Sequence, residues 1–258
     1  MILHIPHSST AIPDNLREPI VLTDAQLENE LRIMTDWYTD ELYTHSDATV
    51  VRFPLSRLLV DAERFSDDSR EPMSKKGMGM IYQSTSSGEP LKRALTSDER
   101  ETLEAYYDHH HEALRQAVEK ELEEYGNALI VDCHSFPDTP LPCNADQTVP
   151  RPEICIGTDG YHTPSSLSQQ AIDEVLKMGY ISTINSPFSG SLVPMSFYQR
   201  DSRVTSIMIE VNRRVYMDET TAEKSKQFNA VKENLQNLLD TLYQWQHPRG
   251  HKNRVHST

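Results

Sequence analysis

Short apolar runs alternate with segments of helical periodicity along most of the chain. The apolar runs are typical of buried strands, and they lie at Ile2 to Ile5, Val50 to Phe53, Leu58 to Val60, Ala128 to Val131, Glu153 to Gly157, Ile181 to Ile184 and Ser206 to Val211. Apolar residues at helical spacing predict helices from Thr23 to about Thr44, from Ser97 to Gly126, from Ser165 to Gly179 and from about Asp218 to Trp245. This alternation predicts an α/β fold with one domain, in which a mostly parallel or mixed central sheet carries helices on both faces.

Two segments lack this pattern. Residues 66–90 are rich in Ser, Gly, Pro and charged residues, so we expect a long irregular excursion there. The closing segment HPRGHKNRVHST, residues 247–258, is basic and predicts a disordered tail. The folded domain is therefore expected over residues 1–246.

Composition excludes several classes of protein. The formal net charge of −14 argues against nucleic acid or an anionic membrane as a partner, because both bind to a basic surface. No apolar run approaches the ~20 residues of a membrane helix, and the first residues lack the features of a signal peptide. The cysteines Cys133, Cys143 and Cys155 form no CxxC pair, so neither a disulfide framework nor a thiolate zinc site is expected. A reducing cytoplasm is the expected location.

Chemically active side chains stand where the predicted strands end. The run Ala128 to Val131 leads directly into Asp132, Cys133, His134 and Ser135, and His7 follows the first strand. Strands of an open α/β sheet present ligand sites at their carboxyl ends, so these histidines are well placed to act. Glu210 lies within the apolar IMIEV, and a carboxylate in such a setting needs a partner or a function. His109, His110 and His111 point in three directions from one helix and are expected to be structural or surface residues.

These residues suggest a hydrolytic centre. Two imidazoles and a carboxylate such as Asp36 form the ligand set of many catalytic zinc sites. A glutamate outside that set can move the proton of a water molecule, and arginines such as Arg57 and Arg64 can hold an oxyanion and an acidic substrate. A serine hydrolase that uses Ser135 or Ser56 with His134 is the competing hypothesis, but no GxSxG motif is present.

Six blocks of the sequence resemble one known family in both residues and order. The blocks are HIPHSSTAIP, TDWYTDEL, PLSRLLVDAERFSDD, VDCHSF, NSPFSGS and MIEVNRRVYMDE, and they extend to about Glu219. The chain in this respect resembles the N-formylglutamate amidohydrolases, which are relatives of zinc carboxypeptidases and aspartoacylases. The resemblance implies a zinc-exopeptidase fold of the phosphorylase/hydrolase-like type.

The resemblance also implies roles for individual residues. It implies metal binding by His7, Asp36 and His134, general base action by Glu210, oxyanion binding by Arg57, carboxylate binding by Arg64, and a pocket rim formed by Asn185 and Gly190. Two positions depart from the pattern of the relatives. Glu63 stands where aspartoacylase-like relatives carry the asparagine of an Asn-Arg pair, and Thr10 stands where an HxxE motif would place its glutamate. Asp40 is the alternative acidic ligand, and Asp132 is expected to orient an imidazole while Cys133 only packs.

The function implied by the resemblance is zinc-dependent hydrolysis of N-formyl-L-glutamate, or of a close N-acyl amino acid, to formate and glutamate. One Zn²⁺ ion is expected, although another divalent metal could serve. The expected partner is a small acidic N-acyl amino acid. The first alternative is a zinc deacylase or carboxypeptidase-like hydrolase acting on another N-acyl amino acid or a peptide. The second is a non-catalytic module that binds a metal or a carboxylate.

Overall fold

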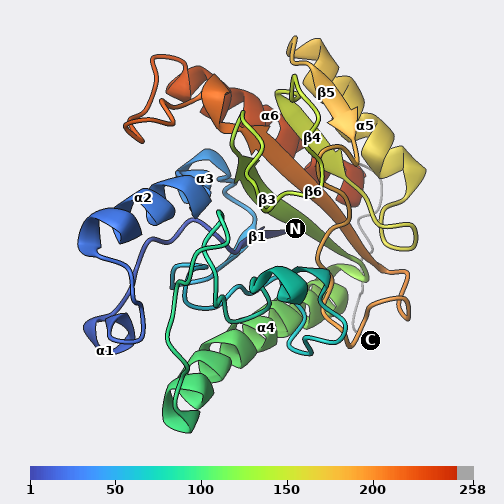
Figure 1. Ribbon diagram of the computed structural model, residues 1–258. Helices are drawn as coiled ribbons and strands as arrows, with labels where there is room; N and C mark the ends of the chain where they lie inside the picture. Colours follow the sequence, from blue (N-terminus) through green and yellow to red (C-terminus); the bar gives the residue numbers. More distant parts are fainter. Residues whose placement is uncertain (249–258) are drawn as a thin grey trace.

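A six-stranded mixed sheet forms the centre of the protein, in a computed structural model that describes residues 1–248 (Figure 1). The strands lie in the order β2-β1-β3-β6-β4-β5. Four neighbouring strands are parallel: β2 (Thr49–Arg52), β1 (Ile2–Ile5), β3 (Ala128–Phe136) and β6 (Val204–Asn212). The strand β4 (Ile154–Gly157) runs antiparallel to β6, and β5 (Ser182–Ile184) runs parallel to β4. The prediction of an α/β fold with a mostly parallel or mixed sheet is confirmed.

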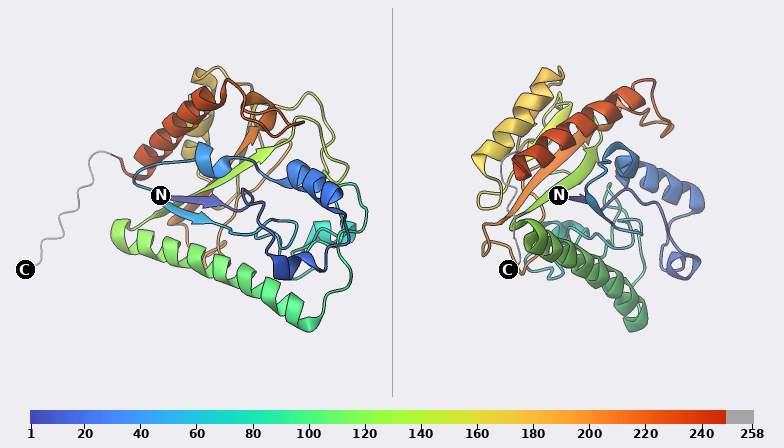
Figure 2. Two further views of the ribbon diagram at one scale, coloured as in Figure 1. Left: turned by 90° about the vertical axis from the view of Figure 1, so that its left-hand side faces the viewer. Right: turned by 180° about the vertical axis from the view of Figure 1, so that it is seen from behind.

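Helices cover both faces of this sheet, as predicted (Figure 2). The long helix α4 (Ser97–Tyr125) packs on one face across β1, β2 and β3. The helices α5 (Ser165–Lys177) and α6 (Phe228–Gln246) pack against each other on the opposite face. Helix α4 starts with a capping box made by Thr96 and Glu99, one residue before the expected cap at Ser97, and ends at Gly126 with a positive φ of 77°.

The register of the parallel strands places polar side chains in a row. Every residue of β3 and β6 is buried, as their apolar composition predicts for central parallel strands. Within that buried sheet His4 lies opposite Asp132, and His134 lies opposite Glu210. Because paired residues of neighbouring strands project to the same face, these four side chains share the face that α4 covers. Their position is the carboxyl end of the parallel strands.

The expected helix from Thr23 to Thr44 is instead two helices separated by a break. Helix α2 (Asp24–Met34) is capped by Thr23 as predicted, and α3 (Thr39–Leu42) begins only after Tyr38, whose φ is 64°. Between them the backbone N–H of Asp36 donates to the carbonyl of His7 at 3.0 Å. This contact with a distant segment takes the place of a hydrogen bond within the helix. It positions Asp36 close to the end of β1.

Two further predictions of regular structure were wrong. Residues 58–60 lie in and directly after a turn and not in a strand, although their side chains are buried, because the backbone N–H groups of Leu58 and Leu59 donate locally to Ser56. The final helix begins at Phe228 and not near Asp218. The Asp218 carboxylate accepts backbone hydrogen bonds from Thr220 and Thr221, which favours a turn over a helix at that point.

The excursion over residues 66–90 is largely irregular, as predicted, but it is packed against the protein. It contains one short 3₁₀ helix, η1 (Pro72–Lys76), and it buries Met78, Met80 and Tyr82 in a second hydrophobic cluster. A remaining short helix is α1 (Asp14–Arg17), and a 3₁₀ turn η2 (Arg213–Val215) follows β6. Apart from its first two residues, the predicted tail lies outside the described residues. None of the described helices combines the length and the apolar character that a membrane crossing requires.

Candidate metal centre and active site

Two histidines meet at the carboxyl ends of β1 and β3. His7 follows β1, His134 lies near the end of β3, and their rings lie 5.2 Å apart between centroids. Both side chains are almost fully buried. The sequence prediction that His7 and His134 come together at strand ends therefore agrees with the structure.

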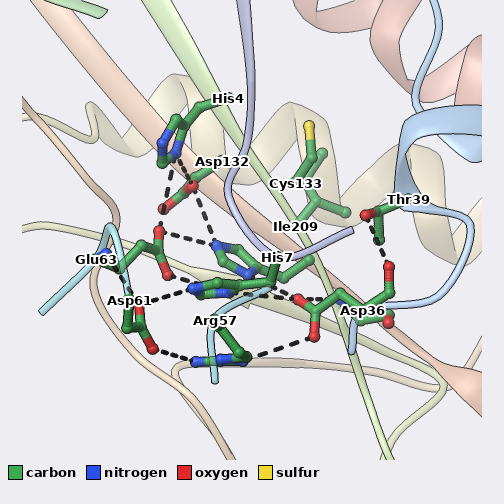
Figure 3. A network of polar contacts seen from close by, with 12 residues as sticks. His4, His7, Asp36, Thr39, Arg57, Asp61, Glu63, Asp132, Cys133 and Ile209 are labelled. Carbon is green, nitrogen blue, oxygen red and sulfur yellow. Dashed lines mark hydrogen bonds and ion pairs between the residues drawn. The ribbon is translucent and has the colours of Figure 1, made fainter. Parts of the chain in front are cut away.

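Each imidazole is held by a carboxylate on one ring nitrogen. Nε2 of His7 lies 2.8 Å from Oδ1 of Asp61, and Nδ1 of His134 lies 3.1 Å from Oδ2 of Asp36. In Figure 3 His7 lies between the carboxylates of Asp61 and Asp36. Carboxylates in this position commonly orient metal-binding imidazoles and leave the opposite nitrogen free for the metal. Nδ1 of His7 is indeed buried without a hydrogen-bond partner among the described residues.

Glu63 lies beside the other ring nitrogen of each histidine, Nδ1 of His7 and Nε2 of His134. Its Oε1 lies 3.0 Å from Nε2 of His134, and its Oε2 lies 3.8 Å from Nδ1 of His7. Donor atoms of His7, Glu63 and His134 all lie within 4.8 Å of one another, which makes this group suitable for a metal ion. Sequence reasoning noted Glu63 as a departure from the relatives' pattern but did not consider it as a ligand.

Asp36, the expected acidic ligand, is near this group but is not part of it. It contacts the far nitrogen of His134, and it also contacts the guanidinium of Arg213 at 3.2 Å. Burial alone would raise the pKa of Asp36, but the neighbouring His134 and His7 imidazoles and the Arg57 guanidinium keep it well below its usual range. The alternative, Asp40, lies at the surface in an ion pair with Arg52. Oδ2 of Asp36 also lies 3.7 Å from Nδ1 of His7, but the group whose donor atoms all lie within 4.8 Å of one another contains Glu63 and neither aspartate.

Asp61 is the most heavily bonded carboxylate of the site. It accepts hydrogen bonds from Arg57 at 2.8 Å, from the Tyr82 hydroxyl at 2.5 Å and from the backbone N–H of Glu63 at 3.0 Å, in addition to its contact with His7. Despite complete burial, which acts in the opposite direction, Arg57 and His7 hold its pKa well below the usual value. Asp61 thus fixes both His7 and the start of the turn that carries Glu63.

The carboxylates generate an electric potential that attracts cations. Burial alone would lower the pKa of His134, but Glu63 and Asp132 raise it well above the ordinary value. Asp61 and Asp36 likewise raise the pKa of His7 against the effects of burial and of Arg57. A potential that favours protons on these nitrogens also favours a metal cation, which would displace those protons on binding.

Glu210 lies on β6 beside His134 and is the candidate proton carrier. It is 7% exposed, and burial raises its pKa to about 7. Its Oε2 has no hydrogen-bond partner among the described residues. A buried carboxyl group that is ready to change protonation near neutral pH suits general acid–base chemistry.

Two arginines, the half-buried Arg57 and the buried Arg213, support the aspartates. Arg57 forms the 2.8 Å bond with Asp61 and lies 3.8 Å from Asp36, while Arg213 donates to Asp36 and to the carbonyl of Ile33. Sequence reasoning missed Arg213, although it lies in the matching block MIEVNRRVYMDE. Arg57 is therefore beside the metal-binding group as expected, with part of its hydrogen-bonding capacity already used by Asp61.

A cavity of about 360 Å³ opens beside the metal-binding group. Its lining includes Glu63, Arg64, Asp132, Gly190 and Met208. Arg64 and Gly190 are thus at the pocket, as expected. Asn185 is not among the lining residues; its side chain bonds to the backbone and the hydroxyl of Thr158, the residue that follows β4. A larger cavity of about 590 Å³ lies near Arg32 and Arg213.

The nucleophile proposed by the competing serine hypothesis is not activated in this structure. The Ser135 hydroxyl contacts Nε of Arg213 at 3.3 Å, and the Ser56 hydroxyl accepts from the backbone N–H of Leu58. Neither hydroxyl forms a hydrogen bond with a histidine among the described residues. Cys133 is fully buried in the core on the face of α5 and α6, as expected for a packing residue.

Comparison with known proteins identifies the family. A model of the N-formylglutamate amidohydrolase family matches residues 1–217. The N-formylglutamate deformylase of Pseudomonas putida is 25% identical over 230 residues, which are 85% of this chain and 82% of that protein.

Two crystal structures share the fold of this chain. The N-formylglutamate amidohydrolase from Ralstonia eutropha is 24% identical and has a TM-score of 0.81, with 94% of this chain and 91% of that chain covered. A gene product of Agrobacterium tumefaciens is 18% identical and has a TM-score of 0.58, with the same coverage of 94% and 91%. The family expected from the sequence blocks is confirmed. Since the family model extends over most of its length, the chain belongs to the N-formylglutamate amidohydrolase family.

Proposed function

We propose that this protein hydrolyses the amide bond of N-formyl-L-glutamate and releases formate and L-glutamate. The observation that carries this proposal is the group formed by His7, Glu63 and His134, which adjoins a pocket lined by Arg64. Membership of a family of amidohydrolases supports the reaction type, and the relative from Pseudomonas putida is named for this substrate. The expected partner is therefore a small acidic N-acyl amino acid.

A Zn²⁺ ion would be held by Nδ1 of His7, Nε2 of His134 and the carboxylate of Glu63. This donor set fits zinc because two neutral imidazoles and one carboxylate are a common catalytic ligand set, and because both imidazoles are already oriented by Asp61 and Asp36. When bound, the ion would supply Lewis-acid polarisation and increase the acidity of water.

Glu210 performs the proton transfers in the proposed reaction. In its ionised form it accepts a proton from the water that attacks the formyl carbon. It then returns this proton to the amine nitrogen as the C–N bond breaks, so no net proton is lost. The guanidinium of Arg57 lies beside the group and stabilises negative charge on the carbonyl oxygen.

Arg64 holds the acidic end of the substrate. It lines the pocket beside Glu63, and its nearest carboxylates, Asp61 and Glu71, lie 3.7 and 3.8 Å away. Both distances exceed that of a direct hydrogen bond, and Nε of Arg64 has no hydrogen-bond partner among the described residues. The guanidinium therefore retains donors with which it can bind a carboxylate in bidentate fashion.

Formate release from N-formylglutamate tests the proposed reaction directly. We expect zinc-loaded protein to release formate, chelation to abolish that release, and added Zn²⁺ to restore it. N-acetylglutamate and N-formylaspartate serve as comparison substrates. Faster turnover of another acyl group would show that the protein is a deacylase of different specificity, and chelator-resistant turnover would exclude the metal-dependent reaction.

The identity of the carboxylate ligand can be tested by metal affinity. We expect Asp36→Asn to weaken zinc binding by about 10–100-fold, because it only loosens the orientation of His134. Glu63→Gln should weaken it further, because a direct ligand is lost. Competition with a chromophoric chelator measures the zinc affinity of both variants. Asp40→Asn is the matched control, and we expect its zinc affinity to equal that of the wild type. The reverse order of effects would make Asp36 the ligand.

The role of Glu210 predicts a loss of turnover without a loss of metal. We expect Glu210→Gln to reduce kcat by about 10²–10⁴-fold, since the amide cannot carry the proton. Zinc content, measured on the same preparation, should stay at the wild-type level. Glu233→Gln, on the exposed side of α6, is the control. Turnover that survives in Glu210→Gln would rule out the proposed proton carrier.

The role of Arg64 predicts a defect in substrate binding. We expect Arg64→Lys to raise KM for N-formylglutamate about tenfold or more, because a lost charge-assisted hydrogen bond costs roughly 1.5–3 kcal/mol. The value of kcat should change much less. Arg100→Lys, an exposed change on α4, provides the comparison. An unchanged KM in Arg64→Lys would assign carboxylate binding to another residue.

A further inference from the structure

A second group of metal-ligand atoms lies next to the first and shares Glu63 with it. Donor atoms of His4, Glu63 and Asp132 all lie within 4.8 Å of one another. Nδ1 of His4 is 2.7 Å from Oδ1 of Asp132 and 3.8 Å from Oε1 of Glu63. Figure 3 shows these three side chains together, with Glu63 between His4 and His7. We propose that the centre binds two divalent transition-metal ions, one at each group, with Glu63 common to both.

The orientation of His4 supports this role. Its Nε2 lies 2.8 Å from Nε2 of His110, which leaves Nδ1 directed at the two carboxylates. His7 and His134 show the same arrangement, in which one nitrogen is held by a neighbour and the other faces the group. In a contact of this length one ring nitrogen donates and the other accepts, so Nε2 of His110 can accept the proton on Nε2 of His4. In that tautomer Nδ1 of His4 is the nitrogen that faces Asp132 and Glu63, the arrangement in which metal-binding imidazoles are commonly held.

The balance of buried charge also favours a second cation. Of the five carboxylates at the centre, Asp36 and Asp61 have guanidinium partners. Within the described part of the chain, Glu63 and Asp132 form ion pairs only with histidines, and Glu210 forms none. Buried carboxylates are costly unless they are paired or bound to metals. A single divalent ion at the first group would leave Asp132 without a full positive partner.

The two carboxylates lie in positions that can bridge. Oδ1 of Asp132 is 3.1 Å from Nε2 of His134 as well as 2.7 Å from His4. Oε1 of Glu63 is likewise close to both His134 and His4, while Oε2 faces His7. Metal pairs in hydrolases are held about 3.5–4 Å apart, and such spacing suits carboxylates shared between two sets of imidazoles. Glu63 and Asp132 both line the cavity, so the second ion would face the substrate.

This inference rests on the proposed function, because Glu63 belongs to both groups. The number of metal ions bound per chain shows whether the second site alone or the proposed function as well fails. Protein stripped with a chelator is reloaded with Zn²⁺, freed of loosely bound metal by gel filtration, and analysed by mass spectrometry against protein concentration. We expect two zinc ions per wild-type chain. One ion would overturn the second site and leave the proposed function standing. No ion would overturn both.

Substitutions locate the second ion. We expect His4→Gln and Asp132→Asn each to retain one zinc ion, and His109→Gln, an exposed histidine on the same helix as His110, to retain two. Circular dichroism and thermal unfolding check that each variant is folded. Two ions in both folded variants would place the second ion elsewhere and overturn the assignment.

A magnetic measurement needs no variant. Wild-type protein loaded with Mn²⁺ should show the electron paramagnetic resonance spectrum of a coupled pair, because ions about 3.5–4 Å apart interact magnetically. The hyperfine spectrum of isolated Mn²⁺ ions at full loading would contradict a shared centre. This readout is independent of catalysis and of any misfolding in the variants.

Discussion

Negative charge buried at the carboxyl ends of β1, β3 and β6 is the constraint on which the rest of the site depends. Asp36, Asp61, Glu63, Asp132 and Glu210 lie close together in a region that excludes most water. Buried carboxylates are stable only with cationic or hydrogen-bonding partners. The protein supplies some of these partners itself, through Arg57, Arg213 and the histidines. The carboxylates without an arginine partner, Glu63 and Asp132, contact ring nitrogens of the histidines instead.

The sheet was predictable from sequence because its strands are defined by local composition. The apolar runs located all six strands, the strand-end rule marked His7 and His134, and the apolar setting of IMIEV marked Glu210. His4 was not recognised, although a histidine inside the apolar run Ile2 to Ile5 is the same kind of signal as Glu210 inside IMIEV. A polar residue inside a buried apolar run is therefore in itself a signal of a site.

Contacts outside the local sequence pattern determine the positions of the residues that sequence reasoning misplaced. Helical periodicity runs through Asp36, but the hydrogen bond from its backbone to His7 breaks the helix there. Glu63 lies in an irregular turn fixed by Asp61, so no repeating pattern marks it. In both cases the deciding partner is distant in the chain or lies within a loop, where composition gives little information. Irregular backbone at a functional site is the expected place for such failures.

An acidic substrate adds a further demand on the same charges. N-formylglutamate carries two carboxylates, and the chain has a formal net charge of −14 with several carboxylates at the pocket. Electrostatic repulsion would keep such a substrate out unless the positive charge near the pocket exceeds the negative charge of the pocket's own carboxylates. Arg64 supplies one such charge, and cations held by the two groups would supply the rest. Metal binding would therefore be needed for the substrate to enter as well as for the amide to be cleaved. The same carboxylates that bind the metal would repel the substrate when no metal is bound.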